Sequence, residues 1–169
     1  MDRMIISELT EAIRDFRLPR YNEIPDMGLY LEQTTKYIQN TLKPLDCFEV
    51  TASMIRNYVK MGLVKNPEKK LYHRDQIVHL ISITILKAII PLDIIHRFFK
   101  SQETVYTDQV AYDYFCMEME NILHARFGLT DDIKDIGTTN SIQKEMLRSA
   151  ITAVSHLVYV NECLKRIEE

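Results

Sequence analysis

Glycine and proline are scarce in this chain, and their scarcity limits its fold more than any other sequence feature. Only 4 glycines and 5 prolines occur among the 169 residues. Tight turns between short strands depend heavily on these two residues, which argues against a sandwich or barrel of many strands. A chain of this length can also bury a sizeable core without covalent staples. The sequence therefore predicts an all-α protein with its own hydrophobic core.

Apolar residues recur at helical spacing along most of the chain. Thr51 and Asp75 are suitable N-caps, and Gly62 and Gly128 stand where a helix commonly ends in a glycine. The predicted helices cover residues 7–16, 26–42, 52–61, 76–90, 92–99, 107–127 and 140–167. Residues 18–27 contain two prolines and are expected to form an extended connector lying on the core, because a residue that precedes proline avoids the helical conformation.

Residues 63–74 have no helical period and are predicted to form a short two-stranded hairpin. Asn66 and Pro67 mark a turn, and apolar residues flank it on both sides. Such a pattern is typical of two short strands joined by a loop.

The cysteines and the apolar runs bear on compartment and chemistry. Cys47, Cys116 and Cys163 are odd in number and far apart, and no cluster of cysteine and histidine has the spacing of a metal site. We expect a reducing, cytoplasmic environment and no bound metal or other cofactor. Neither a signal peptide nor a run of about 18 apolar residues is found, so no membrane partner is expected. The sequence contains no nucleophile elbow, no glycine-rich phosphate loop and no HExxH motif, and we expect no catalytic residues and no enzymatic activity.

The charges are distributed unevenly. Residues 51–74 hold six basic residues and a single acidic one, which gives this stretch a net charge of +5. The whole chain has a net charge of −3, so the remaining residues together carry −8. A local basic patch on an acidic protein indicates one surface that binds a polyanion. A solvated basic loop beside a core helix is the less specific interpretation.

Several polar side chains of this stretch share one face of the helix predicted at 52–61. Ser53, Arg56, Asn57 and Lys60 follow the spacing i, i+3, i+4, i+7. Arginine can pair with guanine and asparagine with adenine at the base edges of the major groove. The basic side chains of the predicted hairpin would contact phosphates on either side. The candidate DNA-binding residues are Thr51, Ser53, Arg56, Asn57, Tyr58, Lys60, Lys65, Lys69, Lys70, Tyr72 and Arg74. Tyr58 and Tyr72 have a second interpretation, in which they pack in the core.

The order of these pieces resembles the DNA-binding domain of MerR-type regulators over residues 49–100. The matching pieces are residues 54–58, Gly62-Leu63, residues 70–72, Asp75 and residues 91–95. The whole chain is also similar to a family of uncharacterised bacterial proteins assigned to that helix-turn-helix class. The resemblance implies a winged helix-turn-helix with a two-stranded wing and additional C-terminal helices. It also implies that Arg56 and Tyr58 contact the DNA backbone and that Lys70 takes the place of a wing arginine. Asn57 departs from the pattern, because relatives usually carry an aromatic residue there.

These observations predict three regions and a function. Residues 1–25 form an N-terminal helix and connector, residues 26–100 the MerR-like DNA-binding region, and residues 101–169 a helical region for dimerisation and perception of a signal. We expect a sequence-specific transcriptional regulator that binds duplex DNA as a homodimer through residues 104–167. A small-molecule effector would suit such a protein, and the sequence does not identify one. The alternative is an all-helical adaptor whose basic patch binds an acidic protein surface instead of DNA.

Overall fold

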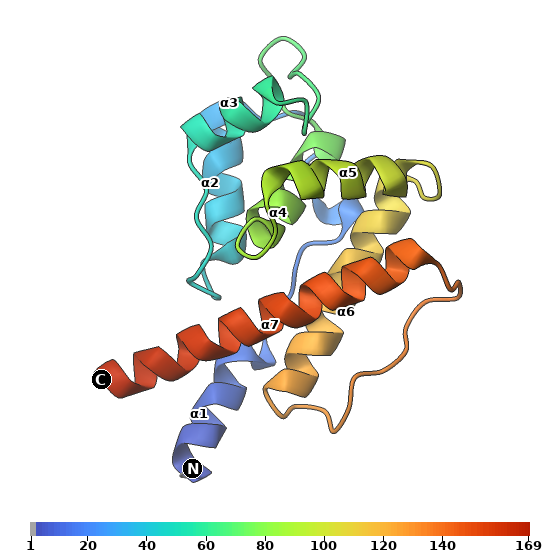
Figure 1. Ribbon diagram of the computed structural model, residues 1–169. Coiled ribbons are helices and arrows are strands. Elements are labelled where there is room, and N and C mark those ends of the chain that lie inside the picture. Colours follow the sequence, from blue (N-terminus) through green and yellow to red (C-terminus); the bar gives the residue numbers. More distant parts are fainter. Residues whose placement is uncertain (1–2) are drawn as a thin grey trace.

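The computed structural model describes residues 3–169 and contains seven α-helices and one 3₁₀ turn within that range (Figure 1). The helices are α1 (Arg3–Arg14), α2 (Leu31–Leu42), α3 (Ala52–Lys60), α4 (Arg74–Leu86), α5 (Leu92–Glu103), α6 (Asp108–Arg126) and α7 (Ile142–Glu168), and the 3₁₀ turn is η1 (Tyr21–Glu23). The prediction of an all-α chain is confirmed for the described residues. Helix α7 crosses α6, both chain ends lie on one side, and the loop between α3 and α4 projects from the opposite end (Figure 1).

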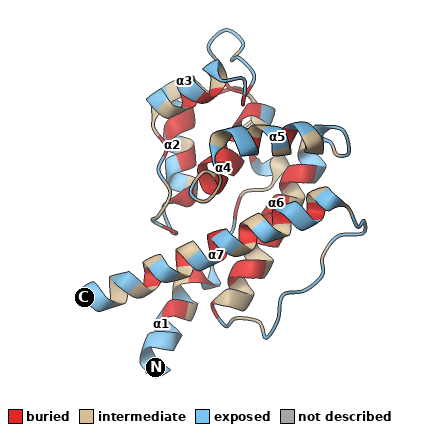
Figure 2. Cartoon of the chain, in the orientation of Figure 1, coloured by how far each residue is buried: buried red, intermediate tan, exposed pale blue. Residues whose placement is uncertain are grey.

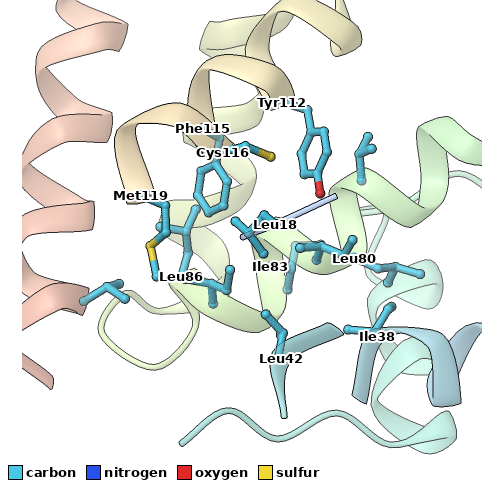
Figure 3. Packing of buried hydrophobic residues seen from close by; sticks show 14 of the residues in the cluster. Leu18, Ile38, Leu42, Leu80, Ile83, Leu86, Tyr112, Phe115, Cys116 and Met119 are labelled. Atoms are coloured by element: carbon cyan, nitrogen blue, oxygen red, sulfur yellow. The ribbon is translucent and has the colours of Figure 1, made fainter. Parts of the chain in front are cut away.

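Helix α4 forms the centre of the core. Ten of its thirteen residues are buried, and its sequence is apolar on nearly all sides, as expected for a helix enclosed by others. Helices α2, α5, α6 and α7 all pack against it. Figure 2 shows α4 buried amid helices that keep an exposed outer face. In Figure 3, Leu80, Ile83 and Leu86 of α4 lie between Ile38 and Leu42 of α2 and the aromatic side of α6.

The connector that joins α1 to α2 lies along α6. Leu18 and Ile24 are fully buried, as the sequence predicted for a segment bound to the core. The guanidinium of Arg20 donates two hydrogen bonds to the carboxylate of Glu120, at 2.7 and 2.9 Å. The hydroxyl of Tyr112 donates to the carbonyl of Pro19 at 2.8 Å. The start of the chain is therefore fastened to α6, although many residues separate them.

The predicted two-stranded wing is wrong. Within residues 3–169 no strand forms, and the segment between α3 and α4 contains only isolated bridges. Glu68 pairs with Leu71 across a tight turn, whereas Tyr72 pairs with Leu29, which lies ahead of α2. The amide and the carbonyl of Tyr72 both form hydrogen bonds with the backbone of Leu29, and Pro67 has no amide hydrogen to donate. The pairing of Glu68 with Leu71 therefore cannot extend along the loop into two strands. We call residues 63–73 the α3–α4 loop.

The pairing of Leu29 also explains why α2 begins later than predicted. The helix was expected from residue 26, but residues up to Tyr30 are not helical and α2 begins at Leu31. Gly28 has a φ of +86°, and a Cβ atom there would lie 3.0 Å from Leu71 and His73. Only glycine combines this conformation with so close an approach, so residue 28 holds the chain against the α3–α4 loop.

Candidate nucleic-acid interface

Helix α3 presents one buried face and one polar face. The hydroxyl of Thr51 accepts a hydrogen bond from the backbone amide of Met54 at 3.1 Å, which confirms the predicted N-cap. Ile55 and Tyr58 point into the core. The four side chains predicted to share a face are all exposed: Ser53, Arg56, Asn57 and Lys60. The outer side of α3 and the adjoining loop form an exposed end of the molecule (Figure 2).

The cations of this face and of the α3–α4 loop are not neutralised by the protein. Arg56 and Lys60 on the helix form no hydrogen bond or ion pair with any residue in the range 3–169. The same is true of Lys65, Lys69 and Lys70 in the loop, all of which are exposed. Glu68 is the single carboxylate within the loop. Five cations at one end of an acidic protein create a local field that attracts polyanions.

The conformation of the α3–α4 loop is set by its backbone and by one buried side chain. Lys69 and Lys70 both have positive φ angles, of 50° and 67°. The amide of Leu71 donates to the carbonyl of Glu68 at 2.8 Å, and these features together define a type I′ turn. Gln76, at the start of α4, is buried, and its amide nitrogen donates to the carbonyls of Lys65 and Asn66 at 3.1 and 2.9 Å. Its oxygen accepts from the amide of His73 at 2.6 Å.

A groove of about 560 Å³ separates α3 from the tip of the loop. Arg56 and Val59 line one side, and Pro67, Lys70 and Tyr72 line the other. The groove is also lined by the N-cap of α2, Tyr30, and by its first two residues, Leu31 and Glu32. Tyr30 was not among the predicted residues; its side chain is 55% exposed and carries a hydroxyl that can donate to a phosphate. Its place in the groove depends on the pairing of Leu29 with Tyr72, which no local sequence pattern indicates.

Three of the predicted DNA-binding residues lie inside the protein or are engaged by it. Tyr58 and Tyr72 are 3% and 4% exposed, which agrees with the second interpretation given to each. Burial raises the pKa of the Tyr72 hydroxyl. Arg74 donates through Nε and Nη2 to the carbonyl of Ile24 at 3.1 and 3.0 Å, and its guanidinium lies over the ring of Tyr21. Arg74 thus fastens the connector to α4, and we do not assign it a phosphate.

Two other kinds of site are not found among residues 3–169. No group of three or more histidine, cysteine or acidic side chains within this range is placed to hold a metal ion. No helix in the range has both the length and the apolar character needed to cross a membrane. The interface that remains consists of Thr51 as a helix cap, Ser53 and Asn57 as uncharged polar side chains on α3, Arg56 and Lys60 as cations on α3, and three lysines on the loop.

Comparison with known proteins identifies a family but no characterised relative. Residues 19–115 match a family described as a domain of unknown function, DUF1836. No curated protein and no solved structure matches the chain. The matched segment runs from the connector into α6 and includes all of α2, α3, the α3–α4 loop and α4. Because the match covers more than half of the sequence, this chain belongs to the DUF1836 family.

Proposed function

We propose that this protein is a transcriptional regulator that binds duplex DNA through α3 and the α3–α4 loop. The observation that carries the proposal is the set of five exposed cations on these two elements, which have no ion-pair partner among residues 3–169, in a chain whose net charge is −3. The ordered resemblance of the same segment to MerR-type regulators supports it. No catalytic activity is part of this proposal.

The shape of this surface suits a protein that contacts bases in the major groove of DNA. A helix fits the major groove, and the residues near its N-terminus are the ones that reach base edges. Ser53 lies in the first turn of α3, Arg56 and Asn57 lie at its middle, and all three are exposed. We assign base contacts to Arg56 and Asn57, which for Arg56 replaces the backbone contact implied by the MerR resemblance, and phosphate contacts to the loop lysines. Glu32, at the end of the groove, would repel a phosphate and limits how far the backbone can enter.

We further propose that the protein binds DNA as a homodimer through α7. The outer side of this helix carries an apolar stripe whose members are exposed: Ile142 (67%), Met146 (39%), Val160 (55%) and Leu164 (50%). Ile142 and Leu164 are equally far in sequence from Ala153, on opposite sides of it, and so are Met146 and Val160. An antiparallel pair of α7 helices crossing at Ala153 therefore places large side chains against large ones and a small residue at the crossing point.

A second copy is the occupant that this symmetry favours. A two-fold interface uses the same patch on both subunits, so the patch has to be complementary to itself. The stripe on α7 meets that condition because its pattern reads alike in both directions. Two-fold symmetry would also supply two α3 helices, one for each half-site of a palindromic DNA site, whose half-sites lie one helical turn, about 34 Å, or a multiple of it apart.

Fluorescence anisotropy tests DNA binding directly. Purified protein is titrated into labelled duplexes from the promoter region of its own gene, at two salt concentrations, with random duplex as competitor. Binding that survives the competitor and weakens steeply with salt is expected, because each phosphate contact releases counterions. Weak association that random duplex abolishes would contradict the proposal and favour the adaptor interpretation, in which the basic patch binds an acidic protein surface.

Two variants separate reading of bases from contact with the backbone. Arg56→Ala is expected to lower the affinity for the specific site by about 1–3 kcal/mol and to reduce discrimination against random duplex. Lys70→Ala is expected to weaken all sequences alike and to lower the salt slope by about one. Lys134→Ala is the matched control, because Lys134 is exposed in the loop between α6 and α7, far from α3 (Figure 1). If Arg56→Ala and Lys70→Ala both bind like the control, the interface is misplaced.

A further inference from the structure

A cavity of about 340 Å³ lies between the end of α5, the outer side of α6 and the start of α7. Its apolar lining comes from Val110, Tyr114 and Met117 of α6 and from Leu147 of α7. Residues 137–139 of the α6–α7 loop pass over it. The space is large enough for a small organic molecule, and it shares no lining residue with the groove beside α3.

A buried ammonium group lines this cavity. The side chain of Lys144 is 5% exposed, and its Nζ lies 5.9 Å from the centre of the Tyr114 ring. A charge in such a place requires a counter-charge, because removal from water is costly unless the group is paired. Lys144 Nζ donates to Oδ1 of Asp135 at 3.0 Å, and no other carboxylate of residues 3–169 lies within ion-pair distance of it.

Asp135 is an exposed partner for this buried cation. Its side chain is 73% exposed, and it belongs to the irregular loop between α6 and α7. Hydrogen bonding to Lys144 holds its pKa below the usual range, so Asp135 remains a carboxylate at neutral pH. Arg148 lies 3.6 Å from the same oxygen and also pairs with Glu118, which is fully buried. Lys144 and Arg148 thus belong to helix α7, whereas Asp135, the carboxylate that pairs with both, belongs to a surface loop.

Besides Asp135, this loop is attached to its surroundings by hydrogen bonds of Asn121 and Arg148 with Lys134 and of Tyr106 with Thr139. The side chain of Asn121 bonds to the backbone of Lys134 at 2.8 and 3.2 Å. Gly137 has a φ of +90°, and a Cβ atom there would lie 3.2 Å from the ring of Tyr114. The loop therefore passes close over the aromatic lining, with Asp135 directed at the ammonium group. Asp135 occupies the position that the carboxylate of a bound molecule would take.

We propose that this cavity binds a small organic carboxylate whose charged group replaces Asp135 on Lys144 and whose apolar body packs against Tyr114, Met117 and Leu147. The side-chain amides of Gln102 and Gln109 lie on the lining and form no hydrogen bond with residues 3–169, so they are available to polar substituents of the ligand. Asp113 also lines the cavity, and its carboxylate accepts a hydrogen bond from the backbone amide of Tyr21 at 2.8 Å. The site does not rest on the proposed DNA binding.

Benzoate is a suitable probe, with benzamide as its neutral counterpart of similar shape. The two compounds are titrated into ¹⁵N-labelled protein while backbone amide shifts are followed. Benzoate is expected to shift the amides of Gly137, Thr138 and Gln143, and benzamide to leave them nearly unchanged. Equal shifts from both compounds, or benzoate shifts confined to other regions, would overturn the assignment of an anion site.

Two variants are expected to change benzoate affinity in opposite directions. Asp135→Asn removes the internal competitor and should strengthen binding by about fivefold, the order of magnitude of one partly exposed ion pair. Lys144→Met keeps an unbranched buried side chain without its charge and should abolish the shifts. Asp132→Asn, in the same loop, is the matched control and should bind like the unchanged protein. Absence of benzoate-dependent shifts in Asp135→Asn at millimolar ligand would refute the site, and this outcome does not depend on whether Lys144→Met folds.

Discussion

Lys69 and Lys70 occupy a backbone conformation that lysine rarely adopts. Both have positive φ angles in the type I′ turn at the tip of the α3–α4 loop. The turn favours Asn followed by Gly, and each residue with a Cβ atom in the left-handed region costs about 1 kcal/mol or more. Strain of this kind is often found where function requires a particular side chain. The lysines thus contribute charge to the proposed interface at the expense of folding stability.

The double variant Lys69→Asn, Lys70→Gly should separate these two contributions. It relieves the strained backbone and should raise the free energy of unfolding by about 1–2 kcal/mol, measured by urea denaturation. The same change removes two phosphate contacts and should lower the slope of log affinity against log salt by about two, measured by anisotropy. A more stable protein that binds DNA less well is the expected outcome.

Lys134→Asn is the control for the loss of charge, since it removes a cation from an exposed loop at the other end of the molecule. It should leave DNA affinity unchanged. If the double variant were stabilised but bound DNA like the unchanged protein, the loop tip would not contact phosphate. The strain would then need another explanation.

Single residues of the site were predictable where their environment is local. The helical period places Ser53, Arg56, Asn57 and Lys60 on one face, and the structure exposes all four. The position of Arg74 was not predictable, because its partners Ile24 and Asp26 belong to the distant connector. From sequence alone, a basic side chain next to a basic loop is taken to be free to bind DNA, because its protein partners lie far away in the chain.

At the level of elements, the α3–α4 loop depends on Gln76. The buried side chain of this residue satisfies two loop carbonyls and one amide. Gln76→Leu leaves all three groups without their partner and should lower the free energy of unfolding by about 2 kcal/mol. Faster hydrogen exchange of amides in residues 65–73 is expected, along with weaker DNA binding, because the loop must then be ordered on association.

Gln76→Glu serves as the matched variant for this prediction. Its carboxylate can still accept from His73 but can no longer donate to the carbonyls of Lys65 and Asn66. Exchange should therefore increase in residues 65–67 more than at His73. Unchanged exchange in both variants would show that the bridge to Leu29 alone holds the loop.

Helices could be predicted from sequence better than the loop, for a physical reason. The predicted cap Thr51 acts on a residue three positions ahead and accepts its backbone hydrogen bond, whereas the predicted cap Asp75 lies inside the first turn of α4, whose N-cap is His73. Thr107 and Ser141 cap α6 and α7 in the same local way as Thr51. The wing was wrong because the partner of Tyr72 is Leu29 and not a residue of the loop itself. A pattern of apolar residues shows that a segment is extended, but it does not show which segment it pairs with.

At the level of the whole molecule, the stripe on α7 determines the proposed assembly. Val160→Glu introduces a charge on each side of the two-fold axis and should convert the dimer to a monomer, measured by analytical ultracentrifugation. DNA affinity should fall by about a hundredfold, because the two half-sites would no longer be bound together. Helix α7 should keep its helical content, since Val160 is 55% exposed in the monomer.

Ile133→Glu is the control for the dimer prediction, because Ile133 is 42% exposed and lies in the α6–α7 loop rather than on α7. It should sediment like the unchanged protein. A monomeric unchanged protein at micromolar concentration would contradict the dimer, while leaving open DNA binding by a single copy.

The bridge between Leu29 and Tyr72 has a consequence for how the protein folds. Tyr72 of the α3–α4 loop pairs with Leu29, and helices α2 and α3 lie between these two residues in the chain. Formation of the pairing therefore costs the entropy of closing this long stretch of chain. A peptide spanning only residues 50–75 lacks both Leu29 and Gln76, and we expect it to be disordered in water. We therefore expect the surface that we assign to DNA to form late in folding, and not as an independent module.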